Sequence, residues 1–191
     1  MTSRVLLVSP ALTASLRQAR FDDGASLDER GRADARAAAG SLPVDATVVT
    51  SDSLRCRETA EALGLSGTDS PADLAGMSMG HWRGRTLHEV STAEPDAVAR
   101  WLADPGYAPT GGESVLGVCA RVARWLDATA AGSGRVVAVV EPEVVRAAVL
   151  HATGAPPAAF WRLDVAPLTV TELSGRAGRW NVRLGRPVTS P

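Results

Sequence analysis

Three short segments, each behind a predicted buried strand, carry the side chains with the clearest chemistry. They hold Ser9 and Pro10, then Arg55, then Glu141 and Glu143. In an open α/β sheet the carboxyl ends of the strands meet at one edge, and ligands bind in the crevice there. We therefore expect these side chains to surround one site.

Arg55 and Glu141 are the two residues of this set that could act on a ligand. An arginine at a helix start can clamp a phosphate or a carboxylate, and a partly buried glutamate beside it can serve as a general acid or base. The alternative is that Arg55 and Glu141 pair with each other and close an idle pocket. We favour the pair, since two separate buried charges beside an apolar sheet are costly.

The other three residues have simpler interpretations, and we count them as candidate ligand contacts. Ser9 could hydrogen-bond a ligand, but it has no neighbouring base that would make it a nucleophile. Pro10 is expected to shape the turn after the first strand. Glu143 suits the first turn of a helix, where the helix dipole stabilises a negative charge.

The strands that position this site are predicted from continuous apolar runs, typical of strands covered on both faces. They span residues 5–8, 46–50 and 135–140. Five helical patterns follow. Three cover residues 27–42, 95–103 and 142–153. One runs from a cap within residues 51–53 to residue 63, and another begins at residue 114 and ends at the glycine at 132. The helix that opens at Ser114 has the clearest apolar stripe, and Pro142 suits the first turn of its helix.

The remaining segments are predicted as loops and short strands. Residues 13–26 form a polar loop over the site, and residues 64–86 are irregular. A short strand is expected over 161–164, and a hairpin joins strands at 168–174 and 180–184. Trp180, Val182 and Leu184 alternate with polar residues, which predicts one covered and one wet face.

The alternation of strands and helices predicts an α/β fold, a three-layer α/β/α sandwich around a mostly parallel sheet. The 191 residues contain no internal repeat, low-complexity tract or linker. A chain of this length suits one domain with a substantial core. We expect a single domain over residues 1–191.

The composition of the chain limits the kinds of binding partner that we expect. A net charge of −1 gives no electrostatic reason to expect nucleic acid or an anionic membrane. Two cysteines, Cys56 and Cys119, do not make a disulfide framework, and no apolar stretch approaches a membrane span. The short apolar run after Met1 does not predict a secretory signal, so we expect a soluble, cytoplasmic protein. We expect a small-molecule ligand and neither a metal nor a cofactor, and a homodimer is compatible with the sequence.

Five segments, in order along the chain, resemble motifs of the histidine phosphatase superfamily, which includes the phosphoglycerate mutases. They span residues 27–35, 50–60, 74–84, 101–114 and 137–146. Gly111-Gly-Glu-Ser114, for example, matches the Gly-Gly-Glu-Ser of that superfamily. The resemblance implies a phosphoglycerate mutase-like fold in which Arg55 holds phosphate. It also implies that Glu113 and Ser114 stand at the rim of the pocket.

The chain departs from these motifs where the chemistry is carried. The superfamily's Arg-His-Gly, whose histidine takes up the phosphoryl group, corresponds to Ser9-Pro10-Ala11. Its proton-donating glutamate corresponds to Gly76, and its second histidine corresponds to Glu141. The resemblance therefore implies the scaffold of a phosphoryl-transfer enzyme without its nucleophile.

Three functional hypotheses remain from the sequence. The leading one is a small-molecule-binding or regulatory pseudoenzyme in which Arg55 and Glu141 are paired. The second is an enzyme with repurposed acid/base chemistry on the same two residues. The third is a phosphatase or phosphoglycerate mutase-type activity by an unrecognised mechanism. A closed salt bridge and a filled pocket favour the first hypothesis. An open cleft with Glu141 exposed at its floor and a raised pKa favours the second.

Overall fold

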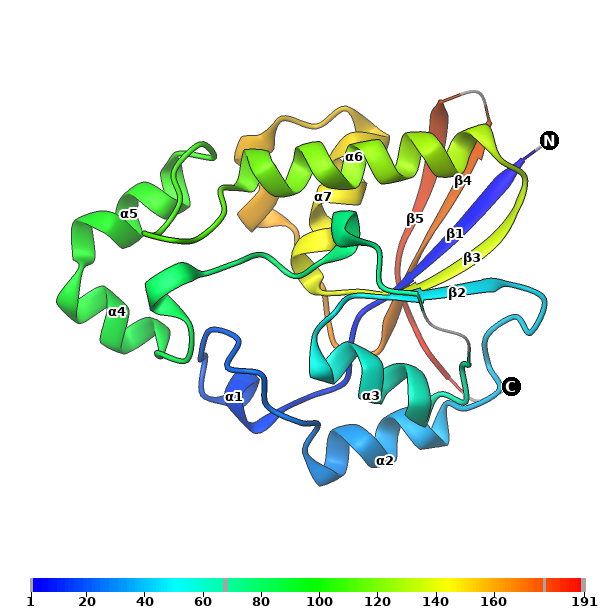
Figure 1. Cartoon of the computed structure of the whole chain (residues 1–191), viewed down its shortest axis with the longest axis horizontal. Coiled ribbons are helices and arrows are strands. Elements are labelled where there is room, and N and C mark those ends of the chain that lie inside the picture. The colour runs from blue at the N-terminus through cyan, green and yellow to red at the C-terminus, as the bar shows by residue number, and fades with distance from the viewer. Residues whose placement is uncertain (1, 67–68, 177, 190–191) are drawn as a thin grey trace.

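A five-stranded sheet lies at the centre of the computed structural model, which describes residues 2–66, 69–176 and 178–189 (Figure 1). The strands are β1 (Ser3–Val8), β2 (Thr47–Thr50), β3 (Gly134–Val139), β4 (Thr169–Arg176) and β5 (Arg179–Pro187). Their order across the sheet is β2-β3-β1-β4-β5. β1 pairs in parallel with β3, as β2 does, whereas β4 runs antiparallel to both β1 and β5. Four strands therefore share one direction, and the predicted mostly parallel sheet is confirmed.

Helices cover both faces of this sheet and make the predicted three layers. Helices α6 (Val115–Ala131) and α7 (Pro142–Thr153) lie on one side, while α2 (Glu29–Ala37) and α3 (Leu54–Ala62) lie on the other (Figure 1). Alternate residues of each central strand face the two layers, because side chains in a strand alternate between faces. In β1, Val5 and Leu7 pack toward α6 and α7, whereas Leu6 and Val8 pack toward α3.

Side-chain caps begin the helices that flank the site, close to where the sequence predicts. The Ser53 hydroxyl accepts a hydrogen bond from the Cys56 amide, and the Ser114 hydroxyl accepts one from the Gly117 amide. Pro142 occupies the first turn of α7, where its missing N–H costs nothing. The helix predicted over 27–42 begins at Glu29, after the Asp28 cap, and ends at Ala37.

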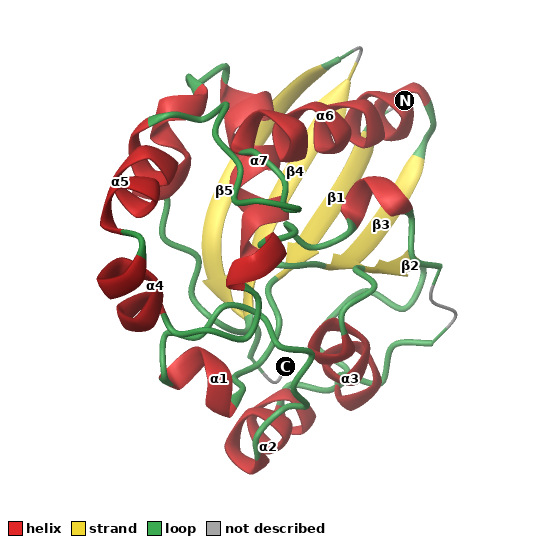
Figure 2. Cartoon of the chain, turned by 60° about the vertical axis from the view of Figure 1, so that its left-hand side comes forward, coloured by secondary structure: helices red, strands yellow, loops and turns green. Residues whose placement is uncertain are grey.

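A lobe of two helices lies beside the main sandwich (Figure 2). The second of them, α5 (Pro95–Ala103), is the short helix that the sequence predicts. The first, α4 (Leu87–Ala93), was not predicted, although Thr86 and Glu89 form a reciprocal capping box at its start. Such a box is a recognised helix signal, so the sequence contained the evidence for α4. The loop predicted over 13–26 also holds a short helix, α1 (Ala14–Arg17).

Two predictions about the C-terminal part are wrong. Residues 161–164 do not form a strand: Trp161 belongs to the 3-10 helix Pro157–Arg162, which two consecutive prolines introduce and whose aromatic side chains face the core. The expected covered face of the hairpin also ends early. Trp180 is buried and Val182 half-buried, but Leu184 is 60% exposed. β5 is an edge strand, and the apolar core reaches only its first half.

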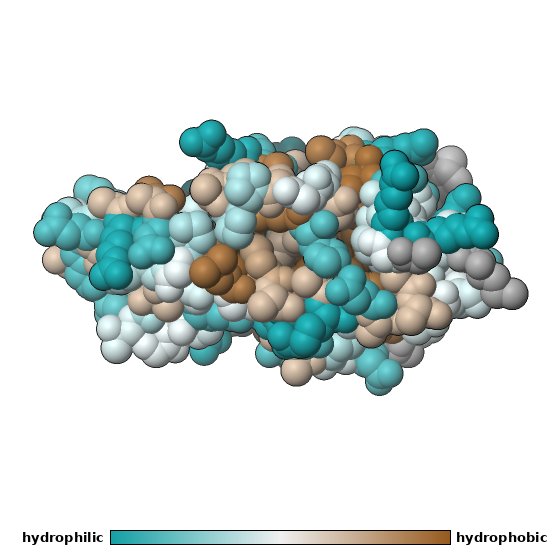
Figure 3. Space-filling view, turned by 90° about the horizontal axis from the view of Figure 1, so that it is seen from above, coloured by the Kyte–Doolittle hydropathy of each residue, from teal (hydrophilic) through white to brown (hydrophobic). Residues whose placement is uncertain are grey.

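The surface seen from the α6 side mixes apolar and charged side chains (Figure 3). Leu116 of α6 is among the exposed apolar residues. Single exposures of this kind are normal in folded monomers. In the part of the chain that the structure describes, no helix combines the length and the apolar character needed to cross a bilayer.

Candidate functional site

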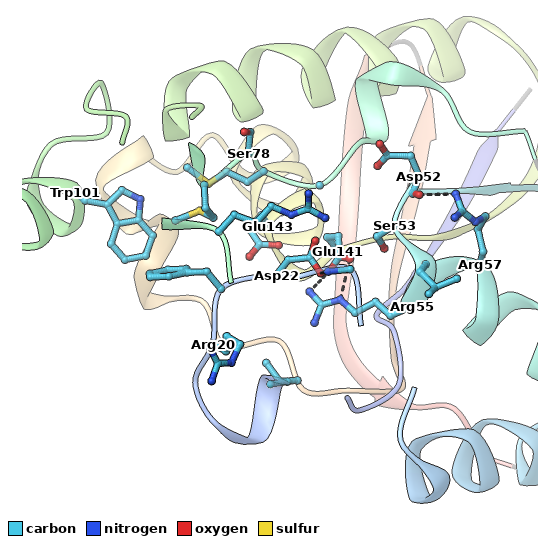
Figure 4. A pocket seen from close by; sticks show the side chains of 18 of the residues that line it. Arg20, Asp22, Asp52, Ser53, Arg55, Arg57, Ser78, Trp101, Glu141 and Glu143 are labelled. Carbon is cyan, nitrogen blue, oxygen red and sulfur yellow. Dashed lines mark hydrogen bonds and ion pairs between the residues drawn. The ribbon is translucent and has the colours of Figure 1, made fainter. Parts of the chain in front are cut away.

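A cleft of about 660 Å³ opens at the carboxyl ends of β2 and β3 (Figure 4). The start of α3 and the start of α7 form its floor, and the loop before α2 forms one wall. That loop contributes Arg20, Phe21 and Asp22, as expected of a segment over the site. The volume falls within the range of ordinary small-molecule pockets. The cleft therefore lies where α/β sheets bind ligands.

A closed ion pair between Arg55 and Glu141 lies on the floor of the cleft (Figure 4). The Arg55 Nε donates to Glu141 Oε1 at 2.8 Å, and a terminal guanidinium nitrogen donates to Oε2. The side chains are 11% and 4% exposed, so both charges are removed from bulk water. Burial alone would lower the pKa of Arg55, but the hydrogen bonds and charge of Glu141 outweigh burial and raise it. The predicted pair is present and bidentate.

Local structure holds this pair in place. Arg55 stands in the first turn of α3, just after the Ser53 cap, and Glu141 is the residue directly before α7. The Glu141 amide donates to the Ser51 hydroxyl at 3.4 Å, which ties the end of β3 to the end of β2. Because both Glu141 oxygens already accept from Arg55, this geometry weighs against Glu141 acting as a general base.

Cys56 lies beneath the pair and is not activated. Its sulfur is 3.7 Å from Glu141 Oε1, and the residue is fully buried. Burial and the adjacent Glu141 charge raise the pKa of the thiol. A neutral, enclosed thiol is a poor nucleophile, so Cys56 acts as core packing.

Glu143 also lines the cleft, half-buried in the first turn of α7. Its enclosed position and the neighbouring Glu141 charge raise the pKa of Glu143. The ion pairs found among the described residues do not include Glu143. Figure 4 shows its side chain between Trp101 and the Arg55–Glu141 pair. Glu143 is therefore a cleft carboxylate without an ion pair of its own among the described residues, although the charges of Arg146 and Arg55 act on it.

An aromatic and thioether wall faces these charges. It is made by Phe21, Met77, Met79, Trp101 and Trp161. The ring centroids of Trp101 and Trp161 are 4.2 Å apart, and Phe21 meets Trp101 edge-on at 5.8 Å. The sequence does not predict that Trp101 and Trp161 meet, because they come from segments sixty residues apart.

Four of the candidate ligand contacts lie outside the cleft lining. Ser9 and Pro10 are buried, and the Ser9 hydroxyl lies 2.6 Å from the Ala166 carbonyl and accepts from the Thr169 amide at 3.0 Å. These bonds tie the end of β1 to the start of β4, so the Ser9 side chain turns away from the cleft.

Glu113 and Ser114 have structural partners of their own. Glu113 makes a bidentate ion pair with Arg121, with N–O distances of 2.8 and 3.0 Å, and Ser114 caps α6. Arg146, which lies within α7, donates to the Leu163 carbonyl at 2.8 Å and lies over the Trp161 ring. Within the described residues, no three histidine, cysteine or acidic side chains gather as a metal site.

Comparisons with known proteins show the family to which this chain is related. The model of the histidine phosphatase superfamily (branch 1) matches residues 13–186. The glucosyl-3-phosphoglycerate phosphatase of Mycolicibacterium vanbaalenii is 39% identical over 127 residues, covering 60% of this chain and 56% of that protein. The bifunctional protein Rv2228c of Mycobacterium tuberculosis is 32% identical over 183 residues, covering 89% of this chain and 50% of that protein. The chain thus spans about half the length of these curated relatives.

A solved structure agrees with the sequence relatives. The mycobacterial glucosyl-3-phosphoglycerate phosphatase Rv2419c, solved with VO3, superposes with a TM-score of 0.83 at 26% identity, covering 96% of this chain and 98% of that one. The expected phosphoglycerate mutase-like fold is confirmed. The family match begins at residue 13, so Ser9-Pro10-Ala11 lies outside it. With a family model that matches most of its length, the chain belongs to the histidine phosphatase superfamily (branch 1).

Proposed function

We propose that this chain is a superfamily member that has lost histidine-dependent phosphoryl transfer and uses its cleft to bind a small molecule. The observation that carries the proposal is the closed pair on the cleft floor. Arg55, which by resemblance would hold phosphate, directs two nitrogens at the Glu141 carboxylate. The Glu141 carboxylate therefore takes up the Arg55 hydrogen-bond donors that a phosphate would need.

The surrounding charges oppose a phosphate as well. A phosphate next to Arg55 would approach the Glu141 and Glu143 carboxylates, both of which line the cleft. At roughly 4 Å and an effective dielectric constant of about 20, each such like-charge contact costs on the order of 4 kcal/mol. The floor of the cleft around Arg55 therefore favours a neutral or cationic ligand over a phosphate monoester.

The histidines offer no replacement nucleophile. None of the three lines the cleft as the described residues define it. His81 lies 2.9 Å from Glu94, and His151 lies 2.9 Å from Asp127 on α6. Phosphoryl transfer through an enzyme phosphohistidine needs an imidazole facing the ligand, and none is in position.

A second candidate function is phosphatase activity by another route. It is favoured by the relative of 39% identity, whose name is glucosyl-3-phosphoglycerate phosphatase. In that case Arg55 would have to release Glu141 and turn to the substrate phosphate, which would leave a buried carboxylate unpaired.

Hydrolysis of a panel of phosphate monoesters, with glucosyl-3-phosphoglycerate included, separates the two candidates. The Mycolicibacterium vanbaalenii enzyme serves as the positive control. We expect no turnover by the natural chain above a heat-denatured sample. Turnover that persists in the purified chain and disappears in Arg55→Ala would overturn the proposal and establish the second candidate.

A further inference from the structure

The cleft holds one carboxylate, Glu143, that takes part in no ion pair among the described residues. Of the arginines that line the cleft, Arg55 is paired with Glu141. Arg57 and Arg20 keep their charge and donate to backbone carbonyls, Arg57 to that of Asp52 at 2.6 Å and Arg20 to that of Gly84. Arg83 is exposed at the rim. Glu143, by contrast, is half-buried and has no ion-pair partner among the described residues. A cation in the cleft would meet this carboxylate at lower effective dielectric than at the surface.

The wall opposite the charges suits the apolar body of such a ligand. Trp101 is 7% exposed, and Met77 and Met79 are 7% and 8% exposed, so the wall is a packed surface. Tryptophan faces attract cations through the ring quadrupole, and thioethers adapt to ligands of varied shape. The Arg146 guanidinium already lies 5.5 Å from the Trp161 ring centroid, which shows this aromatic cluster accommodating a positive charge.

We propose that the cleft binds a small organic cation with a flat apolar body, whose ammonium group pairs with Glu143 and whose body lies against Trp101 and Trp161. The inference rests on the proposed binding function and names the ligand class. The neighbouring Glu141 cannot serve as the counter-ion, because both of its oxygens accept from Arg55. Glu143 thus determines the charge of the ligand that the cleft prefers, and the aromatic wall determines its shape.

Calorimetric titration with three matched probes tests this proposal. Benzylammonium, benzyl alcohol and benzyl phosphate share one ring and differ in charge. We expect benzylammonium to bind the natural chain about tenfold more tightly than benzyl alcohol, as a charge-assisted hydrogen bond warrants, and benzyl phosphate to bind most weakly.

Variants assign the preference to one carboxylate. Glu143→Gln is expected to remove the tenfold difference, whereas Glu143→Asp keeps most of it. Asp52→Asn, which changes an exposed carboxylate of the same cleft, is expected to leave the difference intact. Circular dichroism of each variant verifies that it is folded before titration.

The outcomes separate the ligand class from the underlying function. Equal binding of benzylammonium and benzyl alcohol overturns the cation proposal but leaves a binding cleft. Tightest binding of benzyl phosphate, lost in Arg55→Ala, overturns both the cation proposal and the proposed function. Binding of none of the probes overturns the cation proposal and leaves the proposed function to the hydrolysis assay.

Discussion

A methyl group on the α-carbon of Gly76 would lie 3.2 Å from Cγ of Glu141. By the motif resemblance, these are the positions of the superfamily's proton-donating glutamate and second histidine. The two positions are adjacent on the cleft floor. In this chain residue 76 is a glycine without a side chain, and residue 141 is the glutamate that pairs with Arg55. A side chain at residue 76 and the Arg55–Glu141 pair therefore compete for one space.

This contact predicts the effect of filling the space. Gly76→Ala should destabilise the fold by about 1 kcal/mol, because Glu141 is held by Arg55 and cannot move aside. In a Glu141→Ala background the same substitution should be neutral or stabilising. Urea unfolding of the double-mutant cycle measures the coupling. If Gly76→Ala changed the free energy of unfolding equally in both backgrounds, the contact between residue 76 and Glu141 would contribute nothing to stability.

Removing one partner of the buried pair should cost far more than removing both. Arg55→Met leaves the Glu141 carboxylate, 4% exposed, without a cation, and the expected loss is about 3–5 kcal/mol. Arg55→Met with Glu141→Leu should recover most of that loss, because two apolar side chains replace two buried charges. A double variant no more stable than Arg55→Met would contradict this account of the pair.

Glu143 should reduce stability at neutral pH. Its pKa is raised above the ordinary 4.5 in the folded state by burial and by Glu141, so the native state binds more protons than the unfolded state. Stability attributable to this group then falls as the pH rises from 4.5 through the folded-state pKa. Glu143→Gln should raise the melting temperature at neutral pH and have little effect below pH 4.5, which a thermal scan across pH measures. A lower melting temperature for the variant at neutral pH would be the contrary result.

Glu94 should show the opposite pH dependence. Hydrogen bonds from His81, Trp82 and Arg85 lower its pKa from 4.5 to about 2, with that from His81 the largest cause. A lowered carboxyl pKa contributes stability that is present above 4.5 and is lost as the pH falls toward 2. Glu94→Gln should therefore lower the melting temperature above pH 4.5, and the difference should shrink in acid.

The exposed Glu61 on α3 supplies the control for this experiment. Glu61→Gln should leave the melting temperature nearly unchanged over the same pH range. Because Glu94 lies between α4 and α5, loss of its bonds should loosen the lobe that carries Trp101. Faster hydrogen exchange confined to α4 and α5 in Glu94→Gln would support this, and uniform exchange across the chain would argue against it.

Local features of the sequence determined most of the elements and one part of the site. Continuous apolar runs predicted the three parallel strands, and the Ser53 cap and Pro142 marked the helix starts that hold Arg55 and Glu141. The pairing of those two residues was predictable because both follow parallel neighbouring strands, and a buried charge needs a partner.

Only the tertiary structure decided which way side chains at strand ends point and which distant segments meet. Ser9 ends β1 as predicted, but its hydroxyl is taken by Ala166 and Thr169 of a segment that pairs antiparallel with β1. The wall of Trp101 and Trp161 forms because two apolar segments, each too short to bury its own rings, pack against each other. Such contacts depend on the complementary shape of surfaces far apart in the chain, which local periodicity does not encode.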